Sequence, residues 1–363
     1  MSLRPDTADS GQVMGRASKT RGACVRGVVS CVPSTVVDNA QFESRFGSSA
    51  VADVVKMIGV NSRRIVGPDV SAGDLGLAAA RRLIQALDWE PGSIDGIIFL
   101  SQTPNYRLPA TACELHGQLG LSQSAIAFDV NLGCSGYPYA LWLAMTIVQS
   151  GAARRMLVVL GDTISKVVDP QDRATAMLFG DAGTATAIEG CDRDDPAGDA
   201  SYLLGTDGTG IGRLIIPSGA FKEYAAPADS PLAGRDRTCL YMDGAEIFNL
   251  TLRVVPWLVG RTLEHDGRQP EEYAAFLFHQ ANLFMLKHLI KKTKLPADRV
   301  PINIDRFGNT SCASIPLLLC TEGESRIRPG LARVAAFGFG VGFSWGSACL
   351  DLGGVRIMEL IEV

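Results

Sequence analysis

Short apolar runs that alternate with amphipathic helical segments are the feature that most limits how this chain can fold. Residues 94–101 and 155–161 are typical of buried strands, and residues 74–88 place apolar side chains along one side of a helix. Strands and helices that alternate at these lengths are usually joined as parallel βαβ units. The sequence therefore predicts an α/β protein.

The second half of the chain repeats the order of the first half. Gln102 lies 32 residues before Cys134, and His279 lies 30 residues before Asn309. Cys134 and Asn309 are both predicted to follow a strand, at residues 125–130 and 300–304, and to open an apolar helix. The final strand is predicted at residues 333–337. A weak internal repeat of this kind predicts two similar halves related by a pseudo-twofold axis, which would bring Cys134, His279 and Asn309 to one centre.

The boundary between these halves is predicted at a polar, acidic segment near residues 190–200. Residues 1–20 are polar and show no periodicity, so they are expected to form a disordered tail. The first half then spans residues 21–195 and carries Cys134. The second half spans residues 196–363.

Cys134 stands on a tight turn flanked by Gly133 and Gly136, between a predicted strand and a predicted helix. The positive end of a helix dipole lowers the pKa of a nearby thiol, so this position favours a nucleophilic thiolate. The alternative from this stretch alone is a small apolar core residue, because free cysteine is among the most buried residue types.

The amino-acid composition restricts the cellular compartment and the binding partners that can be expected. The 363 residues carry a formal net charge of −4, which argues against bulk binding of nucleic acid. The nine cysteines are scattered and none forms a C-x-x-C pair, so reduced thiols are expected, with no disulfide and no zinc site. No apolar run approaches the ~18 residues of a membrane span, and no signal peptide is visible. A cytoplasmic protein is expected.

Five further segments occur in a characteristic order. Together with Cys134, they resemble the β-ketoacyl-[acyl carrier protein] synthase III family from about Ala23 to the C-terminus. The resemblance implies a thiolase fold, with two βαβ halves in a five-layer αβαβα arrangement, and no metal or organic cofactor. The segments are Asp169–Arg173, Phe179–Asp181, His279–Asn282, Gly308–Ser311 and the Gly-rich run 338–347.

The resemblance also implies roles for individual residues. Cys134 would carry the acyl group covalently, and the backbone N–H groups of Cys134 and Val341 would hold the oxyanion. A neutral His279 and the Asn309 amide would donate to the enolate oxygen left when a malonyl thioester loses carbon dioxide, and so stabilise it. Taken alone, His279 could be a structural residue, Asn309 a helix N-cap, and the turn at Val341 a simple strand connection.

The same resemblance implies a substrate pocket and a homodimer. Leu108, Phe179 and Asn282 would contact the acyl group or its surroundings, and Leu108 would reach the pocket of the partner subunit. Arg173 would contact phosphopantetheine or its carrier. Met57 and Phe284 stand where the best-known members carry basic residues that contact coenzyme A. These departures argue against coenzyme A as the acyl donor and leave a carrier protein as the alternative.

Lysines on the helix that follows Asn282 are predicted to bind a carrier protein. Lys287, Lys291 and Lys294 recur at i, i+4 and i+7 and so share one face. An acyl carrier protein is acidic and would dock on such a stripe. The alternative is an ordinary solvated helix face.

Four other functions compete with a decarboxylating synthase. An acyltransferase of the same fold could pass the acyl group from Cys134 to a hydroxyl or amine without extending it. A non-catalytic scaffold subunit is the alternative from a different class, and the intact Cys134, His279 and Asn309 argue against it. A biosynthetic thiolase is disfavoured because Cys349 lies outside the Gly-rich turn, and a plant-type polyketide synthase because that family has Pro where this chain has Val341.

Overall fold

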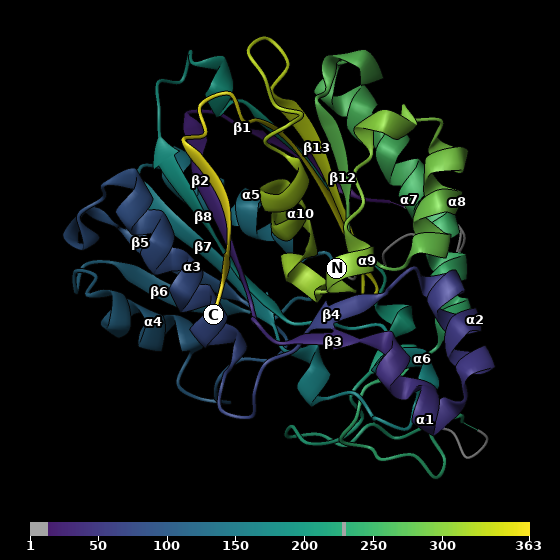
Figure 1. Ribbon diagram of the computed structural model, residues 1–363. Coiled ribbons are helices and arrows are strands. Elements are labelled where there is room, and N and C mark those ends of the chain that lie inside the picture. The colour runs from purple at the N-terminus through teal and green to yellow at the C-terminus, as the bar shows by residue number, and fades with distance from the viewer. Residues whose placement is uncertain (1–13, 227–229) are drawn as a thin grey trace, which may run out of the picture.

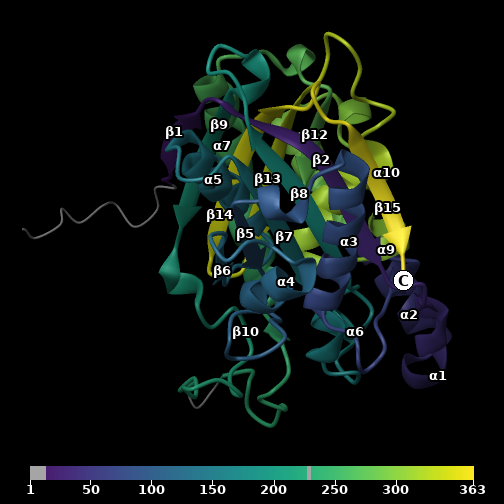
Figure 2. The same ribbon diagram turned by 90° about the vertical axis from the view of Figure 1, so that its left-hand side faces the viewer.

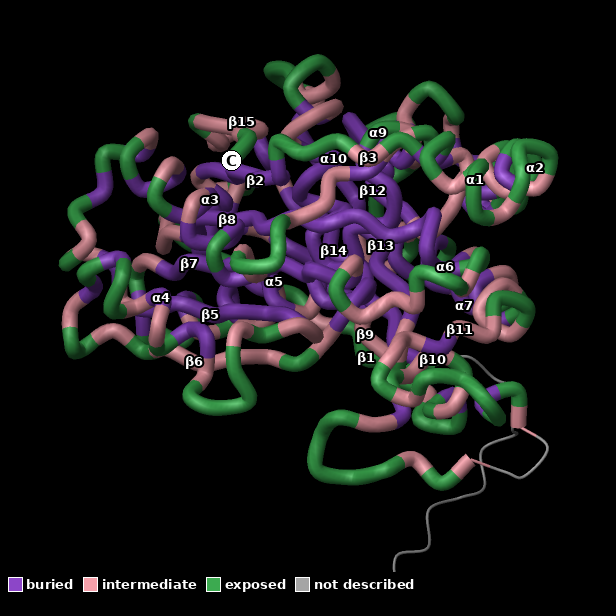
Figure 3. Tube along the Cα trace, turned by 60° about the horizontal axis from the view of Figure 1, so that its bottom comes forward, coloured by how far each residue is buried: buried purple, intermediate pink, exposed green. Residues whose placement is uncertain are grey.

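The structure is a computed structural model that describes residues 14–226 and 230–363. Two β-sheets lie side by side, with helices between them and on both outer faces (Figure 1). The order helix, sheet, helix, sheet, helix is the five-layer arrangement that the family resemblance implied, so the predicted fold class is confirmed. In Figure 3 the buried chain runs through both sheets, while much of the exposed chain lies in the peripheral loops.

One sheet is mainly built from the first half of the chain and has six strands. Its parallel pairs β5–β6 and β5–β7 are the βαβ units that the alternating pattern predicted. In spatial order its strands are β15 (Ile357–Glu362), β2 (Ala23–Val32), β8 (Ala182–Gly190), β7 (Arg155–Asp162), β5 (Gly96–Leu100) and β6 (Ile126–Val130).

The other sheet has five strands and is mainly built from the second half. Its spatial order is β1 (Arg16–Thr20), β9 (Ala200–Thr206), β14 (Ser344–Asp351), β13 (Arg333–Gly340) and β12 (Ala275–Phe278). Two small two-stranded sheets lie outside these layers: β3 (Val36–Asp38) with β4 (Ser62–Arg64), and β10 (Leu214–Ile215) with β11 (Tyr241–Met242).

The helices divide into a central pair and two outer layers. The central helices α5 (Gly136–Gln149) and α10 (Ser314–Glu322) contact both sheets and are therefore apolar around most of their circumference. Outside the first sheet lie α3 (Ala72–Leu87) and α4 (Thr111–Leu119), and outside the second lie α7 (Gly244–Asp266) and α8 (Leu283–Thr293). The remaining helices are α1 (Glu43–Phe46), α2 (Ser48–Ile58), α6 (Arg173–Ala176) and α9 (Ile304–Phe307).

The two halves exchange their outermost strands. β1, from the start of the chain, pairs with β9 of the second sheet, and β15, from its end, pairs with β2 of the first (Figure 2). The predicted tail is therefore wrong for residues 16–20, which form β1. Residues 1–13 of that tail lie outside the described residues. A strand whose partner is nearly 200 residues away carries no local signal of its pairing.

Two further predictions about strands are corrected. The predicted strand at residues 300–304 is absent, and α9 begins at Ile304. Pro301 cannot donate to a sheet ladder, and the apolar Val300 and Ile304 are buried by packing instead. Asn309 consequently follows a short helix and not a strand. The run at residues 333–337 is not the final strand, because β14 and β15 follow it.

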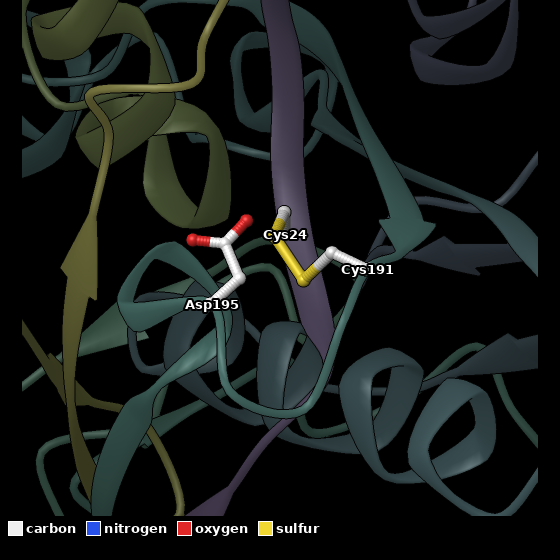
Figure 4. Close-up of side chains that lie close together, drawn as sticks. All are labelled: Cys24, Cys191 and Asp195. Carbon is white, nitrogen blue, oxygen red and sulfur yellow. A yellow bond between two sulfur atoms is a disulfide. The ribbon is translucent and has the colours of Figure 1, made fainter.

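The prediction that all cysteines are reduced is also wrong for one pair. Cys24, in β2, and Cys191, directly after β8, form a disulfide with an S–S distance of 2.28 Å (Figure 4). β2 and β8 are antiparallel, and Cys24 lies opposite Glu189, which brings the two sulfurs together across 167 residues of sequence. The carboxylate of Asp195 lies within 4.8 Å of both sulfurs, but bonded sulfurs offer no thiolate to a metal ion.

Within residues 14–226 and 230–363, no helix combines the length and the apolar character that a membrane crossing requires.

A buried ion pair joins the end of α7 to the start of β13. Arg333 donates to both carboxylate oxygens of Asp266, and Tyr273 Oη donates to Asp266 Oδ2 at 2.6 Å. Burial by itself raises the pKa of Asp266, but the hydrogen bonds from Arg333 and Tyr273 outweigh it and lower that pKa to about 2. The ionised carboxylate is thus stabilised by folding.

We expect Asp266→Ala to lower the free energy of unfolding by about 3–5 kcal/mol, because it leaves the Arg333 charge buried without its partner. Glu264→Ala removes the exposed pair with Arg261 on the same helix and should cost at most about 0.5 kcal/mol. Since folding lowers the Asp266 pKa from 3.8 to about 2, its contribution should be complete above pH 4 and disappear as pH falls through 2. Denaturant titrations at several pH values measure both effects. An equal loss in the free energy of unfolding for the two variants would contradict the role of the buried Asp266–Arg333 pair.

Candidate active site

Cys134 lies between β6 and α5 on a turn that close packing restricts to small residues. A Cβ at Gly136, the first residue of α5, would lie 2.4 Å from Leu100 Cδ2. A Cβ at Gly340, the last residue of β13, would lie 2.7 Å from Cys134 Cβ. Such distances are too short for real side chains, so glycine lets β5 and β13 approach the turn. The predicted strand–turn–helix around Cys134 is confirmed.

Burial dominates the acidity of the Cys134 thiol. It raises the pKa of Cys134 to about 12 and outweighs the opposing effects of the Ser311 hydroxyl and of the backbone N–H groups of Cys134 and Val341. The prediction of a lowered thiol pKa is therefore wrong. Cys134 lies two residues before the start of α5, but burial determines the direction of its pKa shift. Two backbone N–H groups nevertheless converge beside the sulfur atom.

Asn309 is tied to Cys134 through Ser311. The Sγ of Cys134 lies 3.9 Å from Ser311 Oγ, and the backbone N–H of Ser311 donates to Asn309 Oδ1 at 2.9 Å. The Asn309 amide nitrogen makes one long hydrogen bond, at 3.5 Å, to the carbonyl oxygen of Ala281. Its oxygen is thus fixed by the backbone, and its N–H2 group keeps donor capacity.

His279 follows β12 and is almost completely buried, with 2% of its surface exposed. Its Nδ1 lies 2.7 Å from Ser314 Oγ, and its backbone N–H donates to the carbonyl of Phe337. Burial lowers the pKa of His279 to about 3, so the ring is neutral at physiological pH. When Ser314 donates to Nδ1, the single ring proton resides on Nε2. The neutral state of His279 agrees with the sequence-based expectation.

A buried carboxylate connects the two halves beside these residues. Asp162, at the end of β7, accepts hydrogen bonds on Oδ1 from Ser101 Oγ and from the backbone N–H groups of Gln102 and Thr103. The Cys312 thiol donates to its Oδ2 at 3.4 Å. Asp162 therefore fixes the loop after β5 against the segment that carries Ser311.

Sequence reasoning assigned no role to Asp162, Ser311 or Ser314. Ser311 is part of the Gly308–Ser311 segment and has φ +52°, a left-handed conformation that is rare for residues other than glycine. The motif thus pointed to the segment but not to this residue. For Asp162 and Ser314 no local pattern could have given the signal, because their partners lie far away in sequence.

A cavity of about 460 Å³ opens beside Cys134. Phe179, predicted for the acyl pocket, lines it together with Val341 and Ser311. Leu108, also predicted there, is 77% exposed and does not line the cavity within this chain. Its role in a partner's pocket stays a prediction.

A second cavity, of about 420 Å³, lies among α2, α6, α7 and α8, and it brings Arg173 and Asn282 together. Asn282 is the N-cap of α8, where its Oδ1 accepts a hydrogen bond from the backbone N–H of Met285 at 2.8 Å. Asn282 therefore belongs to this cavity and not to the one beside Cys134. Lys287 and Lys291 are exposed on the same helix.

The comparisons with known proteins agree along nearly the whole chain. Residues 128–208 match the 3-oxoacyl-[acyl-carrier-protein (ACP)] synthase III family, and residues 263–352 match its C-terminal part. A putative 3-oxoacyl-[acyl-carrier-protein] synthase 3 from Campylobacter jejuni is 35% identical over 339 residues, which cover 91% of this chain and 94% of the relative. A β-ketoacyl-[acyl-carrier-protein] synthase III from Streptomyces coelicolor is also 35% identical, with 93% and 96% covered.

The comparison with solved structures agrees with the sequence comparison. A 3-oxoacyl-(acyl-carrier protein) synthase from Burkholderia xenovorans LB400 is 56% identical and superposes with a TM-score of 0.94, which covers 98% of this chain and 100% of the other. A synthase III from Thermus thermophilus is 35% identical, with a TM-score of 0.81 over 92% of this chain and 100% of the other.

Proposed function

The chain belongs to the 3-oxoacyl-[acyl-carrier-protein] synthase III family, and on that premise we propose that it condenses an acyl thioester with malonyl-[acyl carrier protein]. The product is a β-ketoacyl thioester, and carbon dioxide is released. The observation that carries this proposal is a buried thiol, Cys134, with two backbone N–H groups beside its sulfur and a neutral imidazole, His279, bound to Ser314.

The first half-reaction loads the acyl group. The sulfur of Cys134 attacks the thioester carbonyl, and the Cys134 proton leaves with the departing thiol. The N–H groups of Cys134 and Val341 donate to the oxyanion that forms. Because burial keeps the thiol protonated, its proton must be transferred during the attack. This coupling limits reaction with bulk solvent before a substrate is bound.

The second half-reaction requires hydrogen-bond donors that stabilise a negatively charged oxygen. Malonyl thioester loses carbon dioxide, and His279 Nε2–H and the Asn309 N–H2 group donate to the enolate oxygen. The enolate carbon then attacks the acyl carbonyl on Cys134, and the Cys134 sulfur leaves as a thiolate, which takes one proton from water to restore the thiol. A neutral donor suits an enolate because it lowers the energy of the anion without protonating it. The scheme requires no metal or organic cofactor.

The test is to incubate the full chain with an acyl thioester and malonyl-[acyl carrier protein]. Carbon dioxide should appear together with the β-ketoacyl product, and mass spectrometry should find the acyl group on Cys134. Transfer of the acyl group to a hydroxyl or amine without carbon dioxide would favour an acyltransferase. If no thioester acylates Cys134, both the condensation and the acyl transfer are refuted.

We expect the carrier to dock on the exposed lysines of α8. The charge reversal Lys287→Glu with Lys291→Glu should raise the apparent KM for carrier-bound malonate several-fold, because an acidic carrier loses its electrostatic attraction. Activity with a short pantetheine thioester should change little, and the wild-type KM should rise with salt.

The matched control is Arg16→Glu with Lys19→Glu, an equal charge reversal on the exposed edge strand β1. It should leave the KM for both substrates unchanged. A loss of activity with the short thioester as well would mean that the α8 substitutions damaged the site. If the KM for neither substrate changes, the lysines of α8 form an ordinary solvated helix face.

A homodimer completes the proposal. β6 is an edge strand of the six-stranded sheet, and Ile126 on it is 42% exposed. The nearby loop exposes Tyr106 at 59% and Leu108 at 77%. Exposed apolar edge strands are usually covered, and a second copy of this chain would cover both features.

Light scattering should therefore find a dimer, and Leu108→Phe should shorten the longest acyl group accepted, because a larger side chain would enter the pocket of the partner. Leu108→Ile, of equal volume, should keep the wild-type chain-length range. A monomer, or an unchanged range in Leu108→Phe, would contradict this assignment.

A further inference from the structure

The cavity beside Cys134 has one polar end and one apolar wall. Ser311 and the backbone at Val341 lie at the sulfur. Gln102 and Asn131 are the other polar side chains among the described lining residues. Gln102 packs against Gly133, the neighbour of Cys134, where a Cβ would lie 2.3 Å from its Oε1. Polar groups therefore gather where the thioester reacts.

The two amide side chains are already paired with each other. Gln102 Nε2 donates to Asn131 Oδ1 at 3.4 Å. This pairing satisfies part of their hydrogen-bonding capacity without a ligand. The amides thus create no requirement for a hydroxyl or keto group on the bound chain.

The rest of the wall is hydrocarbon. Ile164 and Phe179 are buried, with 7% and 5% of their surfaces exposed, and they mark the deep end. Leu214 and Ile215 form β10, which is held in register by its antiparallel pairing with β11. Leu240, directly before β11, completes this part of the wall and is fixed by a backbone hydrogen bond to Val167 O at 2.7 Å.

Exposure increases along the cavity toward the surface. Ile216 is 36% exposed and Ile211 is 60% exposed, so these two form the rim. The apolar wall thus extends from the deep residues near Cys134 to the surface beside β10. An apolar wall that continues from buried residues to the surface fits a straight chain better than a compact group.

The volume of the cavity limits the length of the acyl group that would fill it. A cavity of about 150 Å³ holds one benzene, or about 25 Å³ for each carbon. The 460 Å³ beside Cys134 would then hold about 18 carbons if it were filled completely. The reacting thioester needs part of this volume, and the rim is open to solvent. A two-carbon acyl group would leave most of the aliphatic wall in contact with water, which is unfavourable.

We propose that the acyl group loaded on Cys134 is an unsubstituted straight chain of about eight to ten carbons. The inference rests on the proposed function and specifies its substrate class. Each methylene that moves from water to the aliphatic wall should increase kcat/KM about fourfold until the cavity is filled.

The experiment measures acylation of Cys134 by mass spectrometry, with coenzyme A and pantetheine thioesters of 2 to 14 carbons. The wild type should load octanoyl and decanoyl groups at least ~50-fold more efficiently than acetyl, as several buried methylenes imply. A 3-hydroxyoctanoyl thioester should react more slowly than octanoyl. Faster loading of acetyl, or of the 3-hydroxy chain, would overturn the inference.

Leu240→Trp should fill the apolar part of the cavity. Loading of octanoyl and decanoyl should fall at least ~10-fold while acetyl loading stays within about twofold, because only the long chains need the lost space. Thr238→Trp adds the same indole at an exposed position two residues away, outside the cavity lining, and should preserve the wild-type profile. Equal losses for all chain lengths in Leu240→Trp would contradict its place in the chain-binding wall.

The outcomes also separate this inference from the proposed function. If acetyl loads well and the longer chains do not, the condensation survives and the chain-length assignment fails. If no thioester of any length modifies Cys134, the proposed function fails and the inference falls with it.

Discussion

Cys134→Ala abolishes self-acylation and lowers the condensation rate by about 10⁴-fold or more, the scale on which removal of a covalent nucleophile acts. The fold should survive, because alanine is smaller than cysteine and fits the turn between Gly133 and Gly136. The measurement pairs mass spectrometry of the protein after exposure to acyl thioester with the rate of β-ketoacyl product formation.

Cys113→Ala is the matched control. Cys113 is an exposed free thiol on α4, so it reports any effect of losing a thiol away from the site. That variant should keep wild-type acylation and condensation. Normal condensation by Cys134→Ala would refute the covalent mechanism, and an unfolded Cys134→Ala variant, detected by circular dichroism, would require Cys134→Ser as a second test.

Removal of either enolate donor should separate the two half-reactions. His279→Ala and Asn309→Ala should still load an acyl group on Cys134, but decarboxylation of malonyl thioester should slow by about 10²–10³-fold, or about 3–4 kcal/mol, as when one oxyanion donor is lost. His116→Ala is the control, since the His116 ring, on α4, is hydrogen-bonded to the Ser122 carbonyl. Wild-type decarboxylation by either variant would remove that residue from the mechanism.

The acidity of His279 adds a pH signature to this prediction. With a pKa of about 3, His279 stays neutral from pH 5 to 9, so decarboxylation should show no titration near pH 6.5. Folding lowers this pKa from 6.5, so the unfolded chain binds the extra proton between pH 6.5 and 3. Stability should therefore fall as pH is lowered through that window. A rate that titrates near pH 6.5 would indicate a protonated His279.

Ser314 should act as a positioning residue for His279. Ser314→Ala removes the hydroxyl beside Nδ1, so the ring loses the partner that selects its tautomer. We expect a decarboxylation loss of about tenfold, smaller than for His279→Ala, with unchanged acyl loading. Restored activity in Ser314→Thr, which keeps a hydroxyl, would distinguish positioning from general damage to the core.

The sequence could propose Cys134, His279 and Asn309 as site residues for two reasons. Gly133 and Gly136 flank Cys134 directly, so the tight turn around the thiol has a local signal. The roles of His279 and Asn309 came from the weak internal repeat and from the resemblance of their segments to a known family. The alternation of strands and helices is local in the same sense, and it correctly indicated an α/β fold with layers of helices on its sheets.

The tertiary structure alone decided the properties that depend on distant partners or on the amount of water excluded. β1 and β15 exchange sheets, and Cys24 pairs with Cys191, through contacts that no short window of sequence contains. Asp162, Ser311 and Ser314 enter the site only because the two halves meet there. The thiol of Cys134 shows the difference most clearly: the sequence predicted the helix end that favours a thiolate, but the burial that raises its pKa arises only when β5, β13 and α5 close around the sulfur.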